Sequence, residues 1–538
     1  MVAILLAGLM LRVVPMGQNR TLEDEALYSY WGLQIATGSD PMLDHEPVDK
    51  PPFWPYVVAL SFRLFGGVSP QASGQPSAFR PNVPVVGGPL TCVTSSCLAE
   101  TRRLEAAARL PSLFASVVSI ALVYALGRRL FRDATAGLLA ALLSALSPFA
   151  ILFASTAFVD PWLTAWVLGA LLAASAGRAG LAGILAGLAA ATKQQGLLFV
   201  PLVVAFGVLS DRQRPVPRSV RVRSLVRSLP FVLGFAAVLG GSIVWDQARE
   251  QRPGFFHQSV VSYGGLGFAA LSDLGGRALS WLRLIGTFWV SSWLNRLLLG
   301  ILAVWATHAL LRRLSKGRHG SATDLEPLSL TARLANSAAS VALLLFVLAF
   351  LLLHWLLDLQ IWDRYLLVLL PCVSLLVARA IVSVGRALPA RRWRPAYALC
   401  LAIALMVSLP GPLLRAMRSQ IPVGGDHGAY DGIDTMSSYV RGHLPPGSVL
   451  YDHWLGYHYR FYLYGAALHI HWYPDLADLV EDAQLYVREP RYIAFPSWRS
   501  STATIAALTG AGVALAPILE TYRRDGSVSF QLYQLAGP

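Results

Sequence analysis

The sequence predicts a polytopic α-helical membrane protein with about 11 to 12 transmembrane helices and a small extracytoplasmic α/β domain at the C-terminus. Hydrophobic residues make up 55% of the 538 positions and charged residues only 14%, and the mean hydropathy is +0.52. This composition is too apolar for an ordinary soluble protein. After Pro412 the sequence becomes polar, which divides the chain into a transmembrane core, 1–413, and a domain, 414–538.

Basic residues predict the orientation, because lysine and arginine gather in short stretches between apolar runs, as the positive-inside rule expects of cytoplasmic loops. The net charge of +14 is therefore interpreted as topology, and no RNA-binding or DNA-binding motif indicates a nucleic-acid partner. Placing these stretches inside leaves the N-terminus inside and the C-terminus outside. They are residues 128–132, Arg178, and residues 212–227, 312–318 and 386–394.

Alternation about the basic stretches gives about eleven spans, since roughly 20 apolar residues cross about 30 Å of hydrocarbon. The pair 179–192 and 195–210 is short, and a re-entrant hairpin is its alternative. Residues 276–292 form either an interfacial helix or a twelfth span. The spans are residues 2–16, 105–126, 134–155, 160–177, 179–192, 195–210, 228–245, 294–312, 331–353, 365–385 and 395–413.

The first apolar stretch, Ile4–Met16, has no basic region before it and no small-residue cleavage site after it. This is not the pattern of a cleaved signal peptide. We expect a retained first span, and its short length leaves an upstream start of the chain as an alternative.

The first outer segment, residues 17–104, is expected to carry most of the chemistry. Within it, Phe53–Phe65 is interrupted by Pro55 and Arg63, which predicts an amphipathic helix lying at the interface. Residues 68–100 are rich in proline, glycine and serine and predict a flexible loop.

Two of the four cysteines, Cys92 and Cys97, lie five positions apart in this outer loop. On an oxidising face they either form a small disulfide or remain thiols. Cys372 and Cys400 fall within predicted spans and are expected in the core. No pattern of cysteine and histidine has zinc-ligand spacing.

The C-terminal domain is expected beside the outer loops. Its predicted helices are 434–444 and 475–487, and its predicted strands are 448–453, 492–495 and 530–535. An aromatic run within it either stacks on sugars or forms the packing face of the domain. The run consists of Tyr457, Tyr459, Phe461, Tyr462 and Tyr464.

Candidate catalytic residues open the first outer segment. Asp24 and Glu25 follow the first apolar stretch, and Asp49-Lys50 precedes two prolines. A carboxylate can deprotonate an acceptor hydroxyl or amine, or coordinate a divalent ion, and a lysine can bind phosphate as a point charge. Simple solvation of these acids is the alternative.

Three further residues lie at the ends of apolar spans. Asp160 is a second candidate acid, although Asp before proline is also a helix-start signal. Lys193 is a charge at membrane depth, which marks a functional candidate unless it reaches the outer interface by snorkelling. Arg364 offers a planar fork suited to phosphate oxygens, or else anchors the chain at the interface.

Read in order, these motifs resemble the GT-C membrane glycosyltransferases of family 39, the group of the protein O-mannosyltransferases and the lipid A aminoarabinose transferases. The order and spacing over about the first 200 residues carry the resemblance. The motifs are Asp24-Glu25-Ala26-Leu27-Tyr28, Asp49-Lys50-Pro51-Pro52-Phe53, Leu60-Ser61-Phe62-Arg63-Leu64-Phe65-Gly66, Ala108-Arg109-Leu110-Pro111-Ser112, Gly127-Arg128-Arg129-Leu130-Phe131, Asp160, Thr192-Lys193 and, more weakly, Asp363-Arg364-Tyr365-Leu366-Leu367.

The resemblance implies a helical core whose first outer loop carries the catalytic carboxylate, Asp24, with Glu25 beside it and Asp160 as a second acid. It implies a sugar donor linked to a polyprenyl phosphate and a lipid, glycan or protein acceptor. Lys50 is expected to bind the donor phosphate. Arg364, Lys193 and Arg109 are expected to join it by the same resemblance.

The predicted function is therefore a hexosyl- or pentosyltransferase of the cell envelope, multi-pass in the inner or plasma membrane, with its site on the extracytoplasmic face. An inverting single displacement needs no cofactor, although a divalent cation held by Asp24 and Asp160 is an open alternative. The rival function is a transporter or flippase of lipid-linked sugars. Transporters tend to have midplane charges and internal repeats, whereas here the acids gather on one face and no repeat is found.

Overall fold

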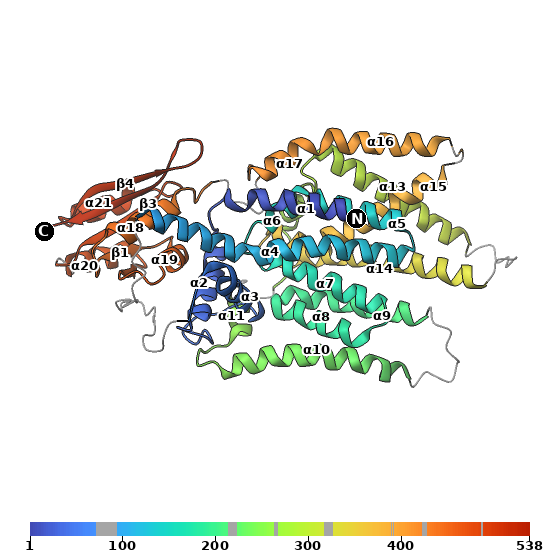
Figure 1. Cartoon of the computed structure of the whole chain (residues 1–538), viewed down its shortest axis with the longest axis horizontal. Coiled ribbons are helices and arrows are strands. Elements are labelled where there is room, and N and C mark those ends of the chain that lie inside the picture. Colours follow the sequence, from blue (N-terminus) through green and yellow to red (C-terminus); the bar gives the residue numbers. More distant parts are fainter. Residues whose placement is uncertain are drawn as a thin grey trace.

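The computed structural model describes residues 1–70, 94–212, 223–262, 267–316, 327–388, 390, 392–421, 428–485 and 488–537. Figure 1 shows long helices that run side by side along the molecule, with a smaller domain of strands and short helices at one end. The start of the chain lies toward the other end of the helical part.

The first half of the helical part surrounds the long helix α4. Its elements are α1 (Val2–Val13), η1 (Val14–Gly17), α2 (Glu23–Thr37), α3 (Phe53–Ser61), η2 (Phe62–Gly66), α4 (Thr94–Phe131), α5 (Ala134–Ala145), α6 (Pro148–Ala154), α7 (Asp160–Ser175), α8 (Ala179–Thr192), η3 (Gln194–Phe199) and α9 (Val200–Arg212).

The second half completes the bundle. Its elements are α10 (Arg223–Ala248), α11 (Phe255–Ser262), α12 (Leu274–Ile285), α13 (Ser292–Lys316), α14 (Pro327–Leu356), η5 (Asp363–Leu366), α15 (Leu370–Ala387), α16 (Trp393–Ser408) and α17 (Pro410–Met417).

Five helical stretches of the described chain are long and apolar enough to cross a membrane, or six if the bent pair α5 and α6 is one span. The bend is 61°, because Ser147 caps α6 and Pro148 at its first position cannot continue α5. Three shorter apolar stretches are also helical. Each predicted span therefore falls on helix. By length and composition, however, fewer than the expected 11 to 12 helices qualify as membrane spans.

The outermost helices expose their apolar side chains. Only 6% of the most apolar window of α10 and 11% of that of α16 and α17 are buried, and these helices lie along opposite edges of the bundle (Figure 1). An apolar surface of this extent is unfavourable in water and favourable in lipid. The fold is therefore that of a polytopic helical membrane protein.

Helix α4 differs from its prediction in length. It begins at Thr94, so residues 94–100, which were expected in a flexible loop, form its first turns. Cys97 is disulfide-bonded, whereas Cys372 and Cys400 are free thiols; Cys372 is buried as expected, but Cys400 is exposed, so its placement in the core was wrong. Cys92 lies outside the described residues.

The C-terminal part contains one mixed sheet with strand order β2-β1-β3-β5-β4. Strand β1 is parallel to β2 and β3, and β5 is antiparallel to β3 and β4. The strands are β1 (Val449–Asp452), β2 (His469–Trp472), β3 (Arg491–Pro496), β4 (Ala514–Tyr522) and β5 (Val528–Ala536), and the helices are α18 (Ile433–His443), α19 (Gly456–Tyr462), α20 (Leu476–Leu485) and α21 (Thr502–Gly510).

Strands β1, β3 and β5 lie where the sequence predicts strands, whereas β2 and β4 were not predicted. Both are edge strands, which bury less and so carry a weaker hydrophobic pattern than central strands. Strand β2 has two histidines in four residues, and β4 contains Pro517 and a register shift beside it.

Buried polar bonds fasten this domain to the helical part. Arg20, in the segment before α2, donates to Glu105 on α4 at 2.6 Å and to Asp434 on α18 at 3.1 Å. The hydroxyl of Tyr462 on α19 donates to Glu105 and bonds the hydroxyl of Thr21. Because these groups are buried and paired, the position of α19 against α2 is well defined.

Candidate active site

Helix α2 presents three consecutive acids at its N-terminus, Glu23, Asp24 and Glu25. Negative side chains are favoured there because the first backbone N–H groups of a helix are unpaired and its dipole is positive at that end. Successive residues of an α-helix point about 100° apart. Neighbouring acids of one turn therefore reach different surroundings.

Glu25 points into the protein and is 1% exposed. Its Oε1 accepts the backbone N–H of Ala157 at 2.6 Å and Arg109 Nε at 3.2 Å, and its Oε2 accepts the N–H of Leu22 at 2.9 Å. One carboxylate thus joins α2, α4 and the segment that leads into α7. Such a role positions the site and leaves no open face for a substrate.

Arg109 is equally buried, at 1% exposed, and its Nη1 donates to the carbonyl oxygens of Met16 and Asn19 at 2.8 Å each. The sequence motifs predict a catalytic role for Glu25 and donor-phosphate binding for Arg109. Their burial and mutual pairing argue against both roles. We interpret the pair as the frame that fixes the start of α2.

Asp24 takes the opposite orientation, and its side chain is 38% exposed. Arg364 Nη1 donates to Asp24 Oδ2, and the guanidinium lies 5.2 Å from the ring centroids of both Phe158 and Trp362. Burial alone would raise the pKa of Asp24, but the charge and hydrogen bond of Arg364 outweigh it and lower that pKa. The carboxylate is therefore ionised and accessible.

A second ion pair joins Lys193, which follows α8, to Asp160, at the first position of α7. Lys193 Nζ lies 2.7 Å from Asp160 Oδ1, and the two side chains are 4% and 2% exposed. Val159 is the N-cap of α7 and no side chain caps it, so the alternative of Asp160 as a capping residue does not apply. Lys193 Nζ also lies 4.8 Å from the ring centroid of Tyr365.

Lys50 supplies the third cation. Its Nζ donates to Asp49, and the Lys50 side chain is 9% exposed. The carbonyl oxygen of Asp49 accepts Gln194 Nε2 at 3.1 Å and the hydroxyl of Ser259 on α11. Gln194 and Ser259 therefore hold this loop in place. Neither could be recognised as functional from the sequence, since an amide and a hydroxyl carry no distinctive pattern.

The residues of the site come from five parts of the chain, and the charges of Arg364, Lys50 and Lys193 all lower the pKa of Asp24. The cluster combines three carboxylates with three cations. It consists of Asp24, Asp49, Asp160, Lys50, Lys193 and Arg364. Among the described residues, no group of three histidine, cysteine or acidic side chains is arranged to hold a metal ion; a divalent ion between Asp24 and Asp160 stays a prediction.

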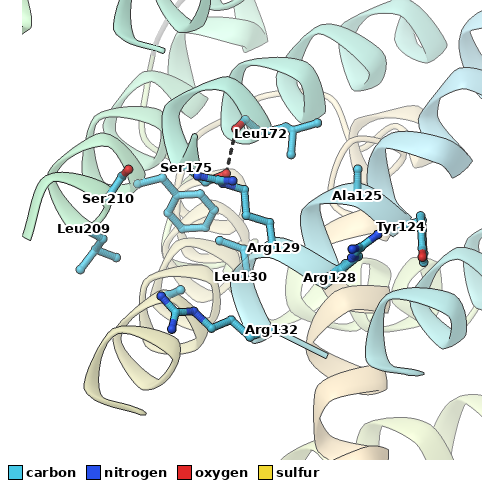
Figure 2. A pocket seen from close by; sticks show the side chains of 12 residues that line it. Tyr124, Ala125, Arg128, Arg129, Leu130, Arg132, Leu172, Ser175, Leu209 and Ser210 are labelled. Atoms are coloured by element: carbon cyan, nitrogen blue, oxygen red, sulfur yellow. Dashed lines mark hydrogen bonds between the residues drawn. The ribbon is translucent and has the colours of Figure 1, made fainter. Parts of the chain in front are cut away.

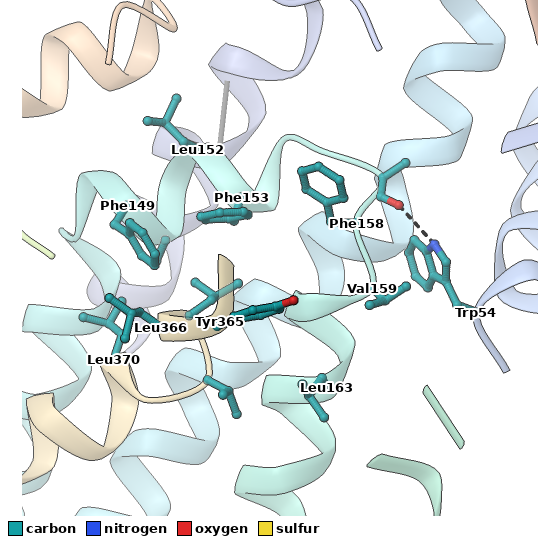
Figure 3. Packing of buried hydrophobic residues seen from close by; sticks show 14 of the residues in the cluster. Trp54, Phe149, Leu152, Phe153, Phe158, Val159, Leu163, Tyr365, Leu366 and Leu370 are labelled. Carbon is teal, nitrogen blue, oxygen red and sulfur yellow. Dashed lines mark hydrogen bonds between the residues drawn. The ribbon is translucent and has the colours of Figure 1, made fainter. Parts of the chain in front are cut away.

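A packed core of aromatic and aliphatic side chains includes Val159 and Tyr365, the sequence neighbours of Asp160 and Arg364 (Figure 3). Trp54 on α3 donates Nε1 to the carbonyl oxygen of Ala157 at 3.0 Å, and Phe153 contacts Phe158 with ring centroids 6.1 Å apart. Tyr365, next to Arg364, is buried in the same core. Close packing of this kind restricts the positions of Arg364 and of the segment before Asp160.

A separate cavity of about 550 Å³ lies where α4 ends. Arg128, Arg129 and Arg132 line it together with apolar residues such as Leu172 and Leu209 (Figure 2), and no carboxylate is among its lining residues. It contains none of the predicted site residues. Its arginines belong to a basic stretch that the sequence analysis places inside.

Residues 95–240 match the family of dolichyl-phosphate-mannose-protein mannosyltransferases. No curated protein matches the chain.

Among solved structures, ArnT from Cupriavidus metallidurans in the apo state is similar, with a TM-score of 0.61, 16% identity, and coverage of 100% of this chain and 98% of that chain. ArnT bound to undecaprenyl phosphate has a TM-score of 0.58 and 15% identity, and the match covers 100% of this chain and 98% of that chain. The Archaeoglobus fulgidus oligosaccharyltransferase in complex with Zn and sulfate has a TM-score of 0.51 and 15% identity, and the match covers 98% of this chain and 72% of that chain. Family match and fold together confirm the resemblance predicted from the sequence, which is to GT-C membrane glycosyltransferases of the protein O-mannosyltransferase and ArnT type.

Proposed function

We propose that this protein is a glycosyltransferase that moves a sugar from a polyprenyl-phosphate donor to an acceptor hydroxyl or amine. The observation that carries the proposal is the exposed carboxylate of Asp24 among three cations, Lys50, Lys193 and Arg364. A carboxylate is the group that a transfer to a hydroxyl needs, and cations are the groups that a phosphate needs. The similarity to ArnT, solved with undecaprenyl phosphate, supports the same donor class.

The reaction is an inverting single displacement. The bond between the anomeric carbon and the phosphate oxygen breaks, and its electron pair leaves with the phosphate. The acceptor oxygen or nitrogen forms the new bond from the opposite side, and its proton goes to Asp24. The cations stabilise the charge that develops on the leaving phosphate.

Arg364 connects binding of the donor phosphate to the basicity of Asp24. In the structure it is bonded to Asp24 and lowers that residue's pKa, which makes Asp24 a weak base. A donor phosphate that recruits Arg364 would weaken this bond. Asp24 then becomes more basic only when donor is present, which limits unproductive chemistry in the empty site.

The site is proposed to face the outside of the membrane. Arg109 contacts Glu25 at the site, and Arg128 lies further along the same helix, α4. At 1.5 Å per residue the two are roughly 28 Å apart, close to the thickness of the hydrocarbon core. Because the basic end of α4 is expected inside, the acid and cation cluster is expected on the opposite face.

The test is donor cleavage by purified protein in lipid nanodiscs supplied with a panel of polyprenyl-phosphate sugars and acceptors. We expect one donor to release polyprenyl phosphate, and Asp24→Asn to lower this rate at least about 100-fold. Glu481→Gln, at an exposed glutamate of α20, is the matched control and should keep the wild-type rate. Movement of an intact donor across the bilayer without cleavage would instead support transport.

A further inference from the structure

A cavity of about 430 Å³ lies between the first turn of α2 and the C-terminal domain. The helical part contributes one lining residue, and the domain contributes the others from β1, β2, α19 and the segment between β1 and α19. The lining residues are Glu23, Asp452, His453, Trp454, Gly456, Tyr457, Arg460 and Trp472.

The wall of the cavity includes a sequence neighbour of the cluster. Glu23, in its wall, is the immediate neighbour of Asp24. Burial raises the pKa of Tyr457 in the same wall, and the charges of Arg460, Asp49 and Asp24 also act on its hydroxyl. A molecule bound here can therefore approach Asp24 from the side of the C-terminal domain.

Aromatic side chains in this wall are left open. Trp472 is 53% exposed and Tyr457 is 42% exposed, whereas Tyr459, Phe461 and Tyr462 of the same aromatic run are buried against the rest of the protein. Of the two roles expected for this run, packing thus accounts for the buried residues only. Exposed aromatic faces inside a hollow are surfaces for a ligand that is apolar on its faces and polar at its edges.

The charged groups of the wall are two carboxylates and one arginine. Asp452 is 4% exposed and its Oδ1 accepts the N–H of Leu455 at 2.8 Å, and Glu23 Oε1 accepts the hydroxyl of Tyr430 at 3.2 Å. The single arginine, Arg460, lies 3.5 Å from Glu46 Oε2. Carboxylates therefore outnumber available cations, which disfavours a phosphorylated ligand here.

We propose that this cavity binds the acceptor and that the acceptor is an uncharged saccharide whose hydroxyl is presented to Asp24. A pyranose or furanose ring has apolar C–H faces that stack on tryptophan and tyrosine, and hydroxyl edges that donate to carboxylates. The inference rests on the proposed function, because it names the acceptor class of that reaction. It separates the two substrates spatially: phosphate at the cations, saccharide at the aromatic wall.

The first experiment measures transfer kinetics with neutral oligosaccharides, the same saccharides bearing a phosphate, and serine- or threonine-containing peptides. For the neutral saccharide, Trp472→Ala and Tyr457→Ala should raise the acceptor KM at least about tenfold and leave the donor KM unchanged. Tyr522→Ala is the control, because Tyr522 is 55% exposed on the same domain but does not line the cavity. Transfer only to peptides or only to phosphorylated acceptors would overturn the proposal.

A second experiment does not depend on turnover. Saturation-transfer NMR with the full chain in nanodiscs reports which sugar protons contact the protein, and it can be done in the Asp24→Asn background. We expect contacts from ring C–H protons that disappear in Trp472→Ala and persist in Tyr522→Ala. Contacts without donor cleavage by wild type would count against the proposed function alone, whereas cleavage with unchanged contacts in Trp472→Ala would overturn the saccharide site alone.

Discussion

Substitutions of the neighbouring acids Asp24 and Glu25 distinguish a residue that takes part in the chemistry from one that positions the site. Glu25→Gln keeps the shape of the side chain but leaves Arg109 buried without its charged partner. It also brings an amide N–H₂ group toward the backbone donors of Leu22 or Ala157, both of which now bond Glu25. Breaking a buried ion pair in this way costs about 3–5 kcal/mol.

The expected result is a loss of stability and activity together. A cost of about 3 kcal/mol corresponds to a fall of roughly 6 °C in the thermal midpoint, at about 2 °C per kcal/mol for a large domain. Asp24→Asn should change the midpoint by less than about 2 °C, because its carboxylate is 38% exposed and its pair with Arg364 is partly solvated. It should nevertheless abolish transfer.

Differential scanning fluorimetry in nanodiscs, beside single-turnover transfer at a temperature below both midpoints, measures the two effects. A double mutant, Glu25→Gln with Arg109→Met, should recover part of the lost stability, since it removes the uncompensated charge. The reasoning would be refuted by a Glu25→Gln protein of wild-type stability whose kcat alone falls, because that is the behaviour of a catalytic acid.

Three other predictions concern donor recognition, pH and helix packing. Arg364→Lys keeps a positive charge but loses the planar fork, so the donor KM should rise about tenfold; an unchanged donor KM in initial-rate assays would remove Arg364 from the phosphate site. Burial raises the pKa of Asp452 to about 6 from an ordinary 3.8, so the folded state holds this proton more tightly than the unfolded state does. Stability should therefore fall, by up to about 3 kcal/mol, as pH rises from about 4 to about 6. Thermal midpoints of Asp452→Asn should lack this pH dependence, and a wild-type profile identical to that of the variant would contradict it. Gly183 on α8 packs so closely that an added Cβ would lie 2.1 Å from the carbonyl oxygen of Phe231 on α10, so Gly183→Ala should destabilise the fold by about 1–3 kcal/mol. Gly207→Ala is the control, because no atom lies within 4 Å of its added Cβ. Equal thermal midpoints for the two variants would refute the close approach of α8 and α10.

Much of the candidate site follows from the sequence because its residues lie at the same end of successive apolar stretches. Alternation of spans alone places Asp24, Asp160, Lys193 and Arg364 on one face, and the structure brings them together with Lys50. The separate roles of Asp24 and Glu25 do not follow from it. Adjacent residues of a helix differ in direction by about 100°, and only tertiary packing decides which one faces Arg109.

The contribution of the C-terminal domain could not be predicted for a similar reason. The aromatic run from Tyr457 to Tyr464 is equally compatible with packing and with ligand binding, and its division into buried and exposed members depends on how α19 docks on α2. Strand β2, which brings Trp472 into the cavity, is a short edge strand with little hydrophobic pattern. The number of spans is also uncertain from sequence, because breaks such as Ser147-Pro148 shorten helices within continuous apolar runs.

The anomeric configuration of the transferred sugar tests the central claim most directly. Wild-type protein in lipid, given a polyprenyl-phosphate sugar and a neutral saccharide acceptor, should form a product whose anomeric configuration is opposite to that of the donor, with one polyprenyl phosphate released per sugar transferred. NMR of the anomeric proton and mass spectrometry of the lipid measure both. Retention of configuration, or disappearance of donor from one leaflet without release of polyprenyl phosphate, would contradict a single displacement assisted by Asp24.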